Sequence, residues 1–144
     1  GLGEAIAASG HARPWFVRVD VTDTPALQQA IGEFAAAAGG LDVLINNVAN
    51  DSRHDPLATT EVSWRQCMAV NLDCAFFASQ TAIALMRERG AGGAIVNFSS
   101  INAVLGPEGM PGYVTAKAGL LGMTKALARQ YGPDGIRVNA ILPG

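Results

Sequence analysis

The sequence predicts an α/β fold in which a doubly wound parallel sheet forms the middle of three layers. Two observations support this prediction. From residue 14 onward, short apolar runs alternate with long segments of helical periodicity, and strands joined through helices run parallel because right-handed crossovers connect them. With 144 residues, 49% of them hydrophobic, the chain contains enough apolar side chains for a single domain over 1–144.

The first part of the chain is predicted to contain two strands and one helix. Residues 15–20 are rich in β-branched and aromatic side chains and are predicted to form a strand. A helix is predicted over 24–38, with Thr24 as its cap and Pro25 at its first helical position, and two glycines follow its last residue. Residues 41–45 are nearly all apolar, which is typical of a strand covered on both faces.

The rest of the chain is predicted to contain two more helices and two more strands. In chain order these are a helix over 62–89, a strand over 94–98, a helix over 113–131 and a strand over 136–142. A polar stretch over 46–60 precedes the first of them, and a loop rich in Gly and Pro covers 102–112. Gly132 and Pro133 are predicted to end the last helix, because Pro cannot continue it.

The first thirteen residues do not fit this alternation. Gly1 and Gly3 look like the end of a glycine-rich turn that leads into a helix, but no apolar run precedes them. Residues 1–20 are too few for a complete strand, turn, helix and second strand. We therefore expect the chain to be incomplete at its start and at Gly144, and a segment to be missing near residues 9–11.

Charge and cysteine content bear on the classes of partner. The net charge of −2 implies no basic face for nucleic acid. We expect no apolar run to have the length needed to span a membrane and no signal peptide is visible, so no membrane partner is expected. Cys67 and Cys74 would lie about 10 Å apart on one helix, too far for a disulfide, and neither has the spacing of a metal ligand. Free thiols, no bound metal and a reducing cytoplasm are expected.

The spacing of three residues indicates acid–base chemistry. Tyr113 and Lys117 are four residues apart on a predicted helix, and Ser100 closes the strand before it. Positions i and i+4 share one face of a helix, so the lysine ammonium can lie beside the phenol. A phenol has a pKa near ~10 in water, and a nearby cation favours its ionised form, which can act as a base. The plain alternative is a surface Tyr and Lys, because this spacing is common by chance.

Several motifs occur in an order that resembles the short-chain dehydrogenase/reductase family. They are Asp20, Asn46-Asn47, Asn71, Ser100, Tyr113, Lys117 and Pro143-Gly144, and the resemblance covers the chain from about residue 15 to its end. It implies a Rossmann-type fold that binds NAD or NADP, with NAD favoured, and an oxidoreductase that acts on CH–OH groups. It also implies an active-site tetrad of Asn71, Ser100, Tyr113 and Lys117, in which Tyr113 is the base and Ser100 holds the substrate oxygen.

The resemblance further implies which residues bind the cofactor. Gly1 and Gly3 would let the backbone approach a pyrophosphate at a helix N-terminus. Asp20 would bind the adenine, with Val21 contributing its backbone, and the alternative is that Asp20 caps the following helix. The remaining cofactor ligands would be Asn47, Tyr113, Lys117, Pro143 and Gly144.

Two asparagine positions each allow two interpretations. The stretch 46–49 resembles the family's Asn-Asn-Ala-Gly turn, whose amides can contact the cofactor or pin neighbouring strands. Ala49 replaces the family's Gly there, which leaves the shape of the turn open but is still small enough for a cofactor to approach. Asn71 lies inside the long helix, where it is either solvated or, as the resemblance implies, helps to hold a water that links Lys117 to solvent.

The loop after the second predicted strand indicates a polar substrate. Residues 50–54 are similar to a stretch in the family's aldose dehydrogenases, such as those that oxidise xylose or galactose. Hydrogen-bonding side chains can discriminate sugar hydroxyls, and the predicted substrate ligands are Asn50, His54, Ser100 and Asn102. His54 can instead be a solvated loop residue, and Asp51 and Arg53 can form a local ion pair. A 3-oxoacyl or other ketone reductase and a non-catalytic nucleotide-binding paralogue are the alternative functions.

The two long helices also predict self-association. Apolar residues occur around more of the segments 62–89 and 113–131 than one core-facing stripe requires. Burial on two sides within one domain is one explanation. The resemblance favours pairing of identical subunits through these helices, as a dimer or a tetramer.

Overall fold

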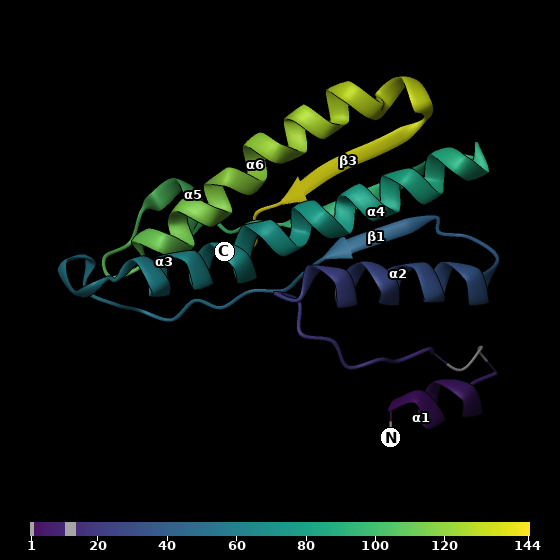
Figure 1. Ribbon diagram of the computed structural model, residues 1–144, viewed down its shortest axis with the longest axis horizontal. Coiled ribbons are helices and arrows are strands. Elements are labelled where there is room, and N and C mark those ends of the chain that lie inside the picture. The colour runs from purple at the N-terminus through teal and green to yellow at the C-terminus, as the bar shows by residue number, and fades with distance from the viewer. Residues whose placement is uncertain (1, 11–13) are drawn as a thin grey trace.

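The computed structural model describes residues 2–10 and 14–144, and its centre is a parallel sheet of three strands. The strands β1 (Val43–Asn46), β2 (Gly93–Phe98) and β3 (Ile136–Ile141) lie in the order β1-β2-β3 (Figure 1). Ile45 pairs with Val96, and Ile95 pairs with Val138. Each strand is joined to the next through a helix, so the expected Rossmann-type α/β arrangement with a parallel sheet is confirmed.

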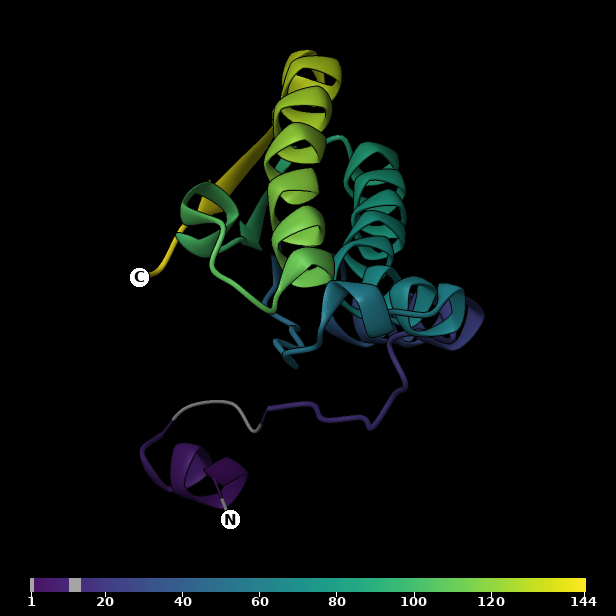
Figure 2. The same ribbon diagram turned by 90° about the vertical axis from the view of Figure 1, so that its left-hand side faces the viewer.

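Helices cover one face of this sheet. The longer ones are α2 (Thr24–Ala38), α3 (Glu61–Met68), α4 (Cys74–Arg89) and α6 (Pro111–Tyr131), and the shorter ones are α1 (Leu2–Ala8) and α5 (Asn102–Leu105). The view along the molecule places α4 and α6 on the same side of the sheet and α1 apart from it (Figure 2). A shared core of the sheet and these helices contains Ala35, Leu41, Ala82, Ile83, Met86, Ile95, Ile136 and Val138.

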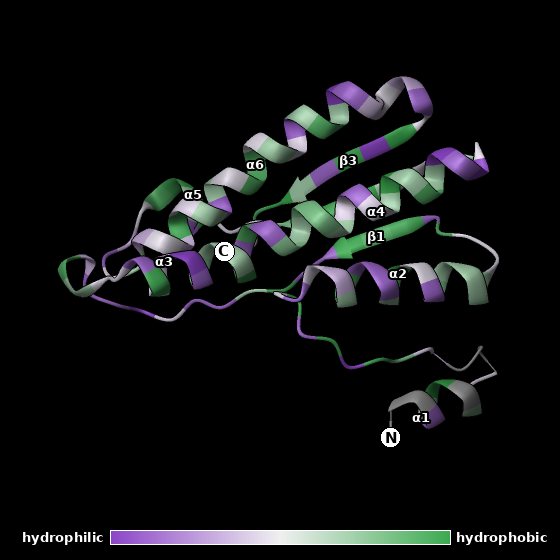
Figure 3. Cartoon of the chain, viewed as in Figure 1, coloured by the Kyte–Doolittle hydropathy of each residue, from purple (hydrophilic) through white to green (hydrophobic). Residues whose placement is uncertain are grey.

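The strand β1 shows that the expectation of cover on both faces was wrong for the described residues. Val43 and Ile45 are 52% and 59% exposed. Leu44 and Asn46, which alternate with them along the strand, face α4 and are partly buried. Figure 3 shows why hydropathy misled, since β1 is coloured as hydrophobic along most of its length. An apolar composition permits burial on both faces, but only packing elements on both sides produce it.

The predicted strand over 15–20 is also absent from the described structure. A strand needs a hydrogen-bonded neighbour, and none of the strands among residues 2–10 and 14–144 lies beside this segment. Trp15, Val17 and Val19 instead line a cavity of about 370 Å³ together with residues of α2 and β1. The ring of Trp15 packs against Phe34 of α2 with the ring centroids 5.8 Å apart.

The predicted helix over 24–38 is confirmed, but its cap is not the predicted one. Asp23, and not Thr24, caps α2, because its carboxylate accepts the backbone N–H of Ala26 at 3.1 Å. The helix ends as expected at Gly39, whose φ of 75° is the left-handed conformation that favours glycine.

The long helix predicted over 62–89 is continuous but not uniform. It begins after Thr60, which forms a capping box with Ser63, and a π-helical segment (Ala69–Asp73) separates α3 from α4. By length and composition the segment Glu61–Arg89 is apolar enough to cross a membrane, contrary to the expectation that no run has this length. The core helix of a globular domain passes the same test, and Ala82, Ile83 and Met86 lie in the core against the sheet.

The second half of the chain follows the prediction closely. The strands β2 and β3 begin and end within about one residue of the predicted ones, and α6 begins two residues earlier than predicted, at Pro111. The segment predicted as a loop over 102–112 contains the short helix α5, which ends at Gly106 with φ 62°. Both ends of this segment therefore carry helical structure next to Ser100 and Tyr113.

Candidate active site

The residues of the predicted tetrad lie around the carboxyl end of β2. Ser100 follows this strand by two residues, and Tyr113 and Lys117 lie in the first two turns of α6. Asn71 lies in the π-helical segment, which contacts α6. The carboxyl edge of a parallel sheet is where ligands bind in open α/β folds, so the topology brings these side chains to a functional edge.

Lys117 and Tyr113 share one face of α6, as their spacing predicted. Both side chains are buried, and the Lys117 ammonium lies 5.7 Å from the centre of the Tyr113 ring. The ammonium donates to the carbonyl oxygen of Phe98 at 2.7 Å. Burial lowers the pKa of Lys117, and the neighbouring Cys74 thiol has the opposite, smaller effect. The alternative of a surface Tyr and Lys is therefore wrong.

Ser100 has a hydroxyl that is free to donate. Its Oγ accepts the backbone N–H of Asn102 at 3.2 Å, and it donates to no acceptor among the described residues. Tyr113 Oη likewise has no hydrogen-bond partner among them, and it is not shut away from solvent. Two hydroxyls whose protons have no acceptor among the described residues can each donate to the oxygen of an alcohol or carbonyl.

The end of the chain runs beside this serine. The backbone N–H of Ser99 donates to Ile141 at 2.9 Å, and that of Ile101 donates to Pro143 at 3.0 Å. The predicted cofactor residues Pro143 and Gly144 therefore lie next to Ser100, on the carboxyl side of β3. Asn102, predicted to bind substrate, is the first residue of α5, two residues after Ser100.

Asn71 is almost completely buried, so the alternative of a solvated Asn is wrong. Its amide joins the π-helical segment to residue 50, because Oδ1 accepts the N–H of Asn50 at 2.8 Å and Nδ2 donates to the carbonyl of Asn50 at 3.0 Å. The second N–H donates to Cys67 at 3.0 Å. The only part of this amide left for a water is the second lone pair of Oδ1.

The sequence allowed the two asparagines at the end of β1 either to pin neighbouring strands or to contact a cofactor, and the structure places them differently. Asn46 pins the sheet, since its Nδ2 donates to Asn97 Oδ1 at 2.8 Å and to Ser79 Oγ at 3.1 Å. Asn47 is exposed at the carboxyl edge of the sheet. A structural role therefore belongs to Asn46, whereas Asn47 is placed where a ligand can reach it.

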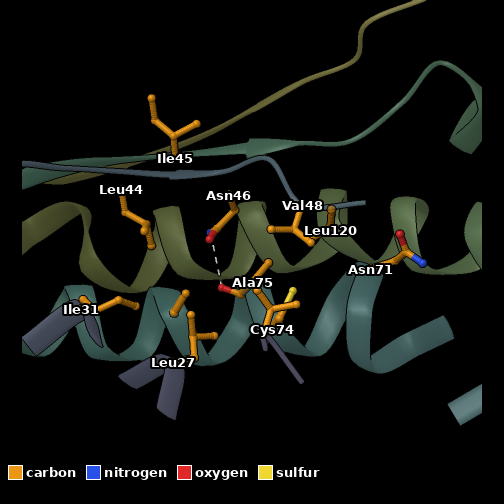
Figure 4. A pocket seen from close by; sticks show the side chains of 12 residues that line it. Leu27, Ile31, Leu44, Ile45, Asn46, Val48, Asn71, Cys74, Ala75 and Leu120 are labelled. Atoms are coloured by element: carbon orange, nitrogen blue, oxygen red, sulfur yellow. Dashed lines mark hydrogen bonds between the residues drawn. The ribbon is translucent and has the colours of Figure 1, made fainter. Parts of the chain in front are cut away.

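A cavity of about 150 Å³ lies between β1 and the helices at this edge. Figure 4 shows Asn46 and Asn71 among its labelled lining residues, with the aliphatic side chains of Leu27, Ile31 and Leu44 on the Asn46 side and Asn71 at the opposite end. Val21 also lines it, next to the exposed Asp20.

Asp20 does not cap the following helix. Its Oδ1 accepts the backbone N–H of Thr22 at 2.9 Å and the Thr22 hydroxyl at 2.8 Å, and these bonds lower its pKa, the backbone bond most. Gly3 lies in α1, while Gly1 and residues 11–13 lie outside the described residues, so the proposed gap near residues 9–11 falls partly outside them.

The loop over 50–54 packs against the loop that precedes Tyr113. The N–H of His54 donates to Gly109 at 2.8 Å, and Arg53 donates to the carbonyl of Glu108 at 3.2 Å rather than pairing with Asp51. The Nε2 atom of His54 is buried and has no partner, so this residue is not the solvated side chain of the alternative interpretation. The side-chain oxygen of Asn50 is bonded to Ser52 within the loop.

Sequence reasoning missed two residues that contact the segment of α6 around Tyr113 and Lys117. Ser99 donates to the backbone carbonyl of Lys117 at 2.7 Å, and Cys67 packs against Gly112, the residue before Tyr113. The doubled serine at the end of an apolar strand was the available signal for Ser99. No sequence pattern indicates the approach of Cys67, because it depends on how α3 packs on α6.

Comparison with known proteins decides the family. A family model described as "Enoyl-(Acyl carrier protein) reductase" matches residues 2–144. The chain belongs to the short-chain dehydrogenase/reductase family. The resemblance drawn from Asn71, Ser100, Tyr113 and Lys117 is thus confirmed at the level of the family.

Members of the short-chain dehydrogenase/reductase family that act on sugars are among the similar proteins. "Probable galactose dehydrogenase GalD" of Rhizobium meliloti is 47% identical over 99% of this chain and 56% of its own length. "D-xylose 1-dehydrogenase" of Caulobacter vibrioides is 42% identical over 98% of this chain and 55% of its own length. A crystal structure of a short chain dehydrogenase from Mycobacterium smegmatis matches with a TM-score of 0.92 and 30% identity, over 98% of this chain and 59% of that one. The chain thus spans about half the length of the curated relatives it matches.

Proposed function

We propose that this protein is an NAD- or NADP-dependent oxidoreductase that transfers a hydride between a substrate alcohol or carbonyl and nicotinamide, acting as an aldose 1-dehydrogenase. The observation that carries the proposal is the buried ammonium of Lys117, which donates to the Phe98 carbonyl and lies 5.7 Å from the centre of the Tyr113 ring. Ser100, two residues after Phe98, has a hydroxyl proton without an acceptor among the described residues. A buried cation is costly, so its presence at this edge needs a functional reason.

The residues at this edge fit a nicotinamide cofactor. An ammonium has three N–H donors, and that of Lys117 uses one of them, on Phe98, among the described residues. The others can hold ribose hydroxyls, while Asn47, Pro143 and Gly144 border the same edge. Asp20 and Val21 are the residues that we propose for the adenine. When bound, the nicotinamide ring supplies the hydride acceptor or donor.

The side chains then have separate tasks. Tyr113 removes the proton from the substrate hydroxyl as the carbinol hydrogen leaves, and Ser100 donates to the substrate oxygen. The charge of Lys117 stabilises the negative charge that Tyr113 carries as a base. Asn71 holds the loop at residue 50 through its amide, and its remaining Oδ1 lone pair can accept from a water on the route of the proton to solvent.

An aldose is the substrate class that we propose, supported by two observations. Relatives at 47% and 42% identity are described as galactose and xylose dehydrogenases. The loop over 50–54 adds polar groups near the start of α6, including the unpartnered Nε2 of His54. A site that hydrogen-bonds sugar hydroxyls discriminates strongly against analogues that lack them.

We also propose that the protein self-associates through α4 and α6. A cavity of about 650 Å³ runs between these helices on their outer side, lined by Leu72, Phe76, Phe77, Gly119, Met123 and Leu127 among others. Phe76 is 41% exposed there. A second copy that packs on this groove would bury these side chains and form a dimer or a tetramer. The two cysteines are free, which is consistent with a location in the reducing cytoplasm.

The test is an absorbance assay for the reduced nicotinamide with the full-length protein. NAD and NADP are each offered with galactose, xylose and further aldoses, and reduced cofactor is offered with 3-oxoacyl and enoyl thioesters. We expect aldose oxidation at the highest kcat/KM. Turnover of a thioester alone would favour the reductase named by the family model, and no turnover with any substrate would favour a non-catalytic nucleotide-binding protein.

A further inference from the structure

The hydroxyl of Ser99 is bonded to the backbone of Lys117. Its Oγ donates to the Lys117 carbonyl oxygen at 2.7 Å, and the side chain is buried. The Lys117 carbonyl lies in the interior of α6, where it also accepts the helical N–H of residue 121. Ser99 is therefore not needed to satisfy this carbonyl, and its bond is an additional tie between β2 and α6.

Two consecutive residues thus hold both ends of Lys117. The carbonyl of Phe98 accepts from the ammonium at 2.7 Å, while the hydroxyl of Ser99 donates to the backbone. The next residue in the chain is Ser100. The segment that carries the proposed substrate-binding serine therefore also holds the backbone and the ammonium of Lys117 in place.

We propose that Ser99 is a positioning residue, which sets the distance of the Lys117 ammonium and the Tyr113 ring from Ser100. This role rests on the proposed function. If the tie is removed, α6 can slide or rotate slightly against the end of β2, and Tyr113 and Lys117 move together relative to Ser100. A misplacement of about 1 Å can cost ~100-fold in rate when reacting groups must meet in one geometry.

The surroundings of the ammonium define what such a movement would change. Within residues 2–10 and 14–144, the titratable groups beside it are the Tyr113 phenol on α6 and the Cys74 thiol on α4. Cys74 donates to Val70 at 2.9 Å, within its own helical segment. A shift of α6 against β2 therefore changes the position of the lysine charge relative to the phenol, and the pH dependence of proton transfer reports this change.

The test compares Ser99→Ala with Ser79→Ala in the full-length protein. Ser79 serves as the control, because it is also buried and its Oγ donates to a backbone carbonyl, that of Ala75, at 2.6 Å, although it also accepts from Asn46 Nδ2 at 3.1 Å. Both variants lose one buried hydroxyl, and we expect similar, small losses of thermal stability. Rates of aldose oxidation are measured from pH 6 to 10 together with cofactor affinity by fluorescence of the reduced nicotinamide.

We expect Ser99→Ala to lower kcat about tenfold and to change the pH profile of the rate, because the lysine charge is displaced from the reacting groups. Ser79→Ala should keep the wild-type profile, and Ser99→Thr, which retains the hydroxyl, should recover it. An active wild type with an unchanged profile in Ser99→Ala overturns the positioning role alone. Equal rate losses in both alanine variants, with no shift in pH, also overturn it. A wild type without turnover overturns the proposed function and this role with it.

Discussion

The ammonium of Lys117 donates to the carbonyl oxygen of Phe98, so α6 is anchored to the end of β2 by a charge-assisted hydrogen bond of 2.7 Å. Lys117 is only 1% exposed. The fold therefore holds a charge in a place where desolvation disfavours it, and the substitutions below separate what this charge does for the reaction from what it costs the fold.

Replacement of Lys117 by Met should abolish turnover and leave the fold at least as stable at pH 7. Burial lowers the lysine pKa from 10.5 in the folded state. Between the lowered value and 10.5, the unfolded chain binds a proton that the folded protein lacks, so the unfolding free energy rises with pH in this window. Met removes both this rise and the buried charge, and we expect a stabilisation on the order of 1 kcal/mol at pH 7.

Urea unfolding of wild type and Lys117→Met from pH 7 to 10.5 measures this difference. Lys125→Met serves as the control, since Lys125 lies on the same helix and is exposed. A wild-type unfolding free energy that falls through the alkaline window, by more than in the Met variant, would contradict the prediction.

Replacement of Tyr113 by Phe should remove the base while keeping the packing of the ring. General acid–base catalysis contributes roughly 10²–10⁴-fold, and we expect kcat to fall by that factor. Cofactor affinity should change little, because the Lys117 ammonium keeps its contact with Phe98. Tyr131→Phe is the control at the far end of α6, where the ring lies under the Arg87 guanidinium. A Tyr113→Phe variant that kept wild-type turnover would remove Tyr113 from the mechanism.

Replacement of Gly112 by Ala should displace the first turn of α6. A Cβ atom at this position would lie 2.9 Å from Cys67 Sγ and 3.4 Å from Cys67 Cβ, so something must move. We expect a destabilisation of about 1–3 kcal/mol and a loss of turnover, because Tyr113 is the next residue. Removal of the sulfur relieves the closest contact, so the double variant Gly112→Ala with Cys67→Ala should recover most of both losses.

The control for this pair is Gly122→Ala on the same helix. Nothing lies within 4 Å of a Cβ atom there, and Ala is the better helix former, so this variant should be about 0.5–1 kcal/mol more stable. Thermal unfolding and initial rates on the same samples give both readouts. If Cys67→Ala fails to rescue Gly112→Ala, the contact between α3 and α6 is not what holds Tyr113.

The sequence predicted most of the fold because its signals were local. Residues 24–38 and 113–131 have helical periodicity, with Gly39 and Pro133 as stops, and they form α2 and most of α6. The meeting of Ser100 with the Tyr113 helix followed from the rule that parallel strands end at one edge. Residues 15–20 have the composition of a strand, but a strand exists only where another strand accepts its hydrogen bonds.

The rest of the site depends on contacts between elements, which the periodicity of the sequence does not predict. The π-helical segment around Asn71 and the bond from Ser99 to Lys117 follow from how α3, α4 and α6 settle on the sheet. The role of Asn46 in pinning β1 to β2 was one of two possibilities until the register placed Asn97 opposite it. Sequence reasoning therefore named candidate reactive groups but not the groups that hold them.

Replacement of Phe76 by Glu should disrupt self-association. Phe76 and Phe77 stand edge to face with their centroids 5.3 Å apart, at the mouth of the groove between α4 and α6. A stable interface buries about 1,200–2,000 Å² in total, and a carboxylate in its apolar centre would be desolvated without a partner. We therefore expect wild type to elute as a dimer or tetramer in size-exclusion chromatography with light scattering, and Phe76→Glu to elute as a smaller species.

Phe34→Glu tests whether any exposed phenylalanine would have this effect. Phe34 is 37% exposed, close to the 41% of Phe76, but it lies on α2 against Trp15, away from the groove. This variant should keep the oligomeric state of the wild type. Because Phe76 is partly exposed in a single copy, its replacement should cost a monomer little stability, so a smaller mass that keeps the wild-type circular dichroism spectrum reports dissociation rather than unfolding. A monomeric wild type, or an unchanged mass in Phe76→Glu, would show that this groove is not a subunit interface.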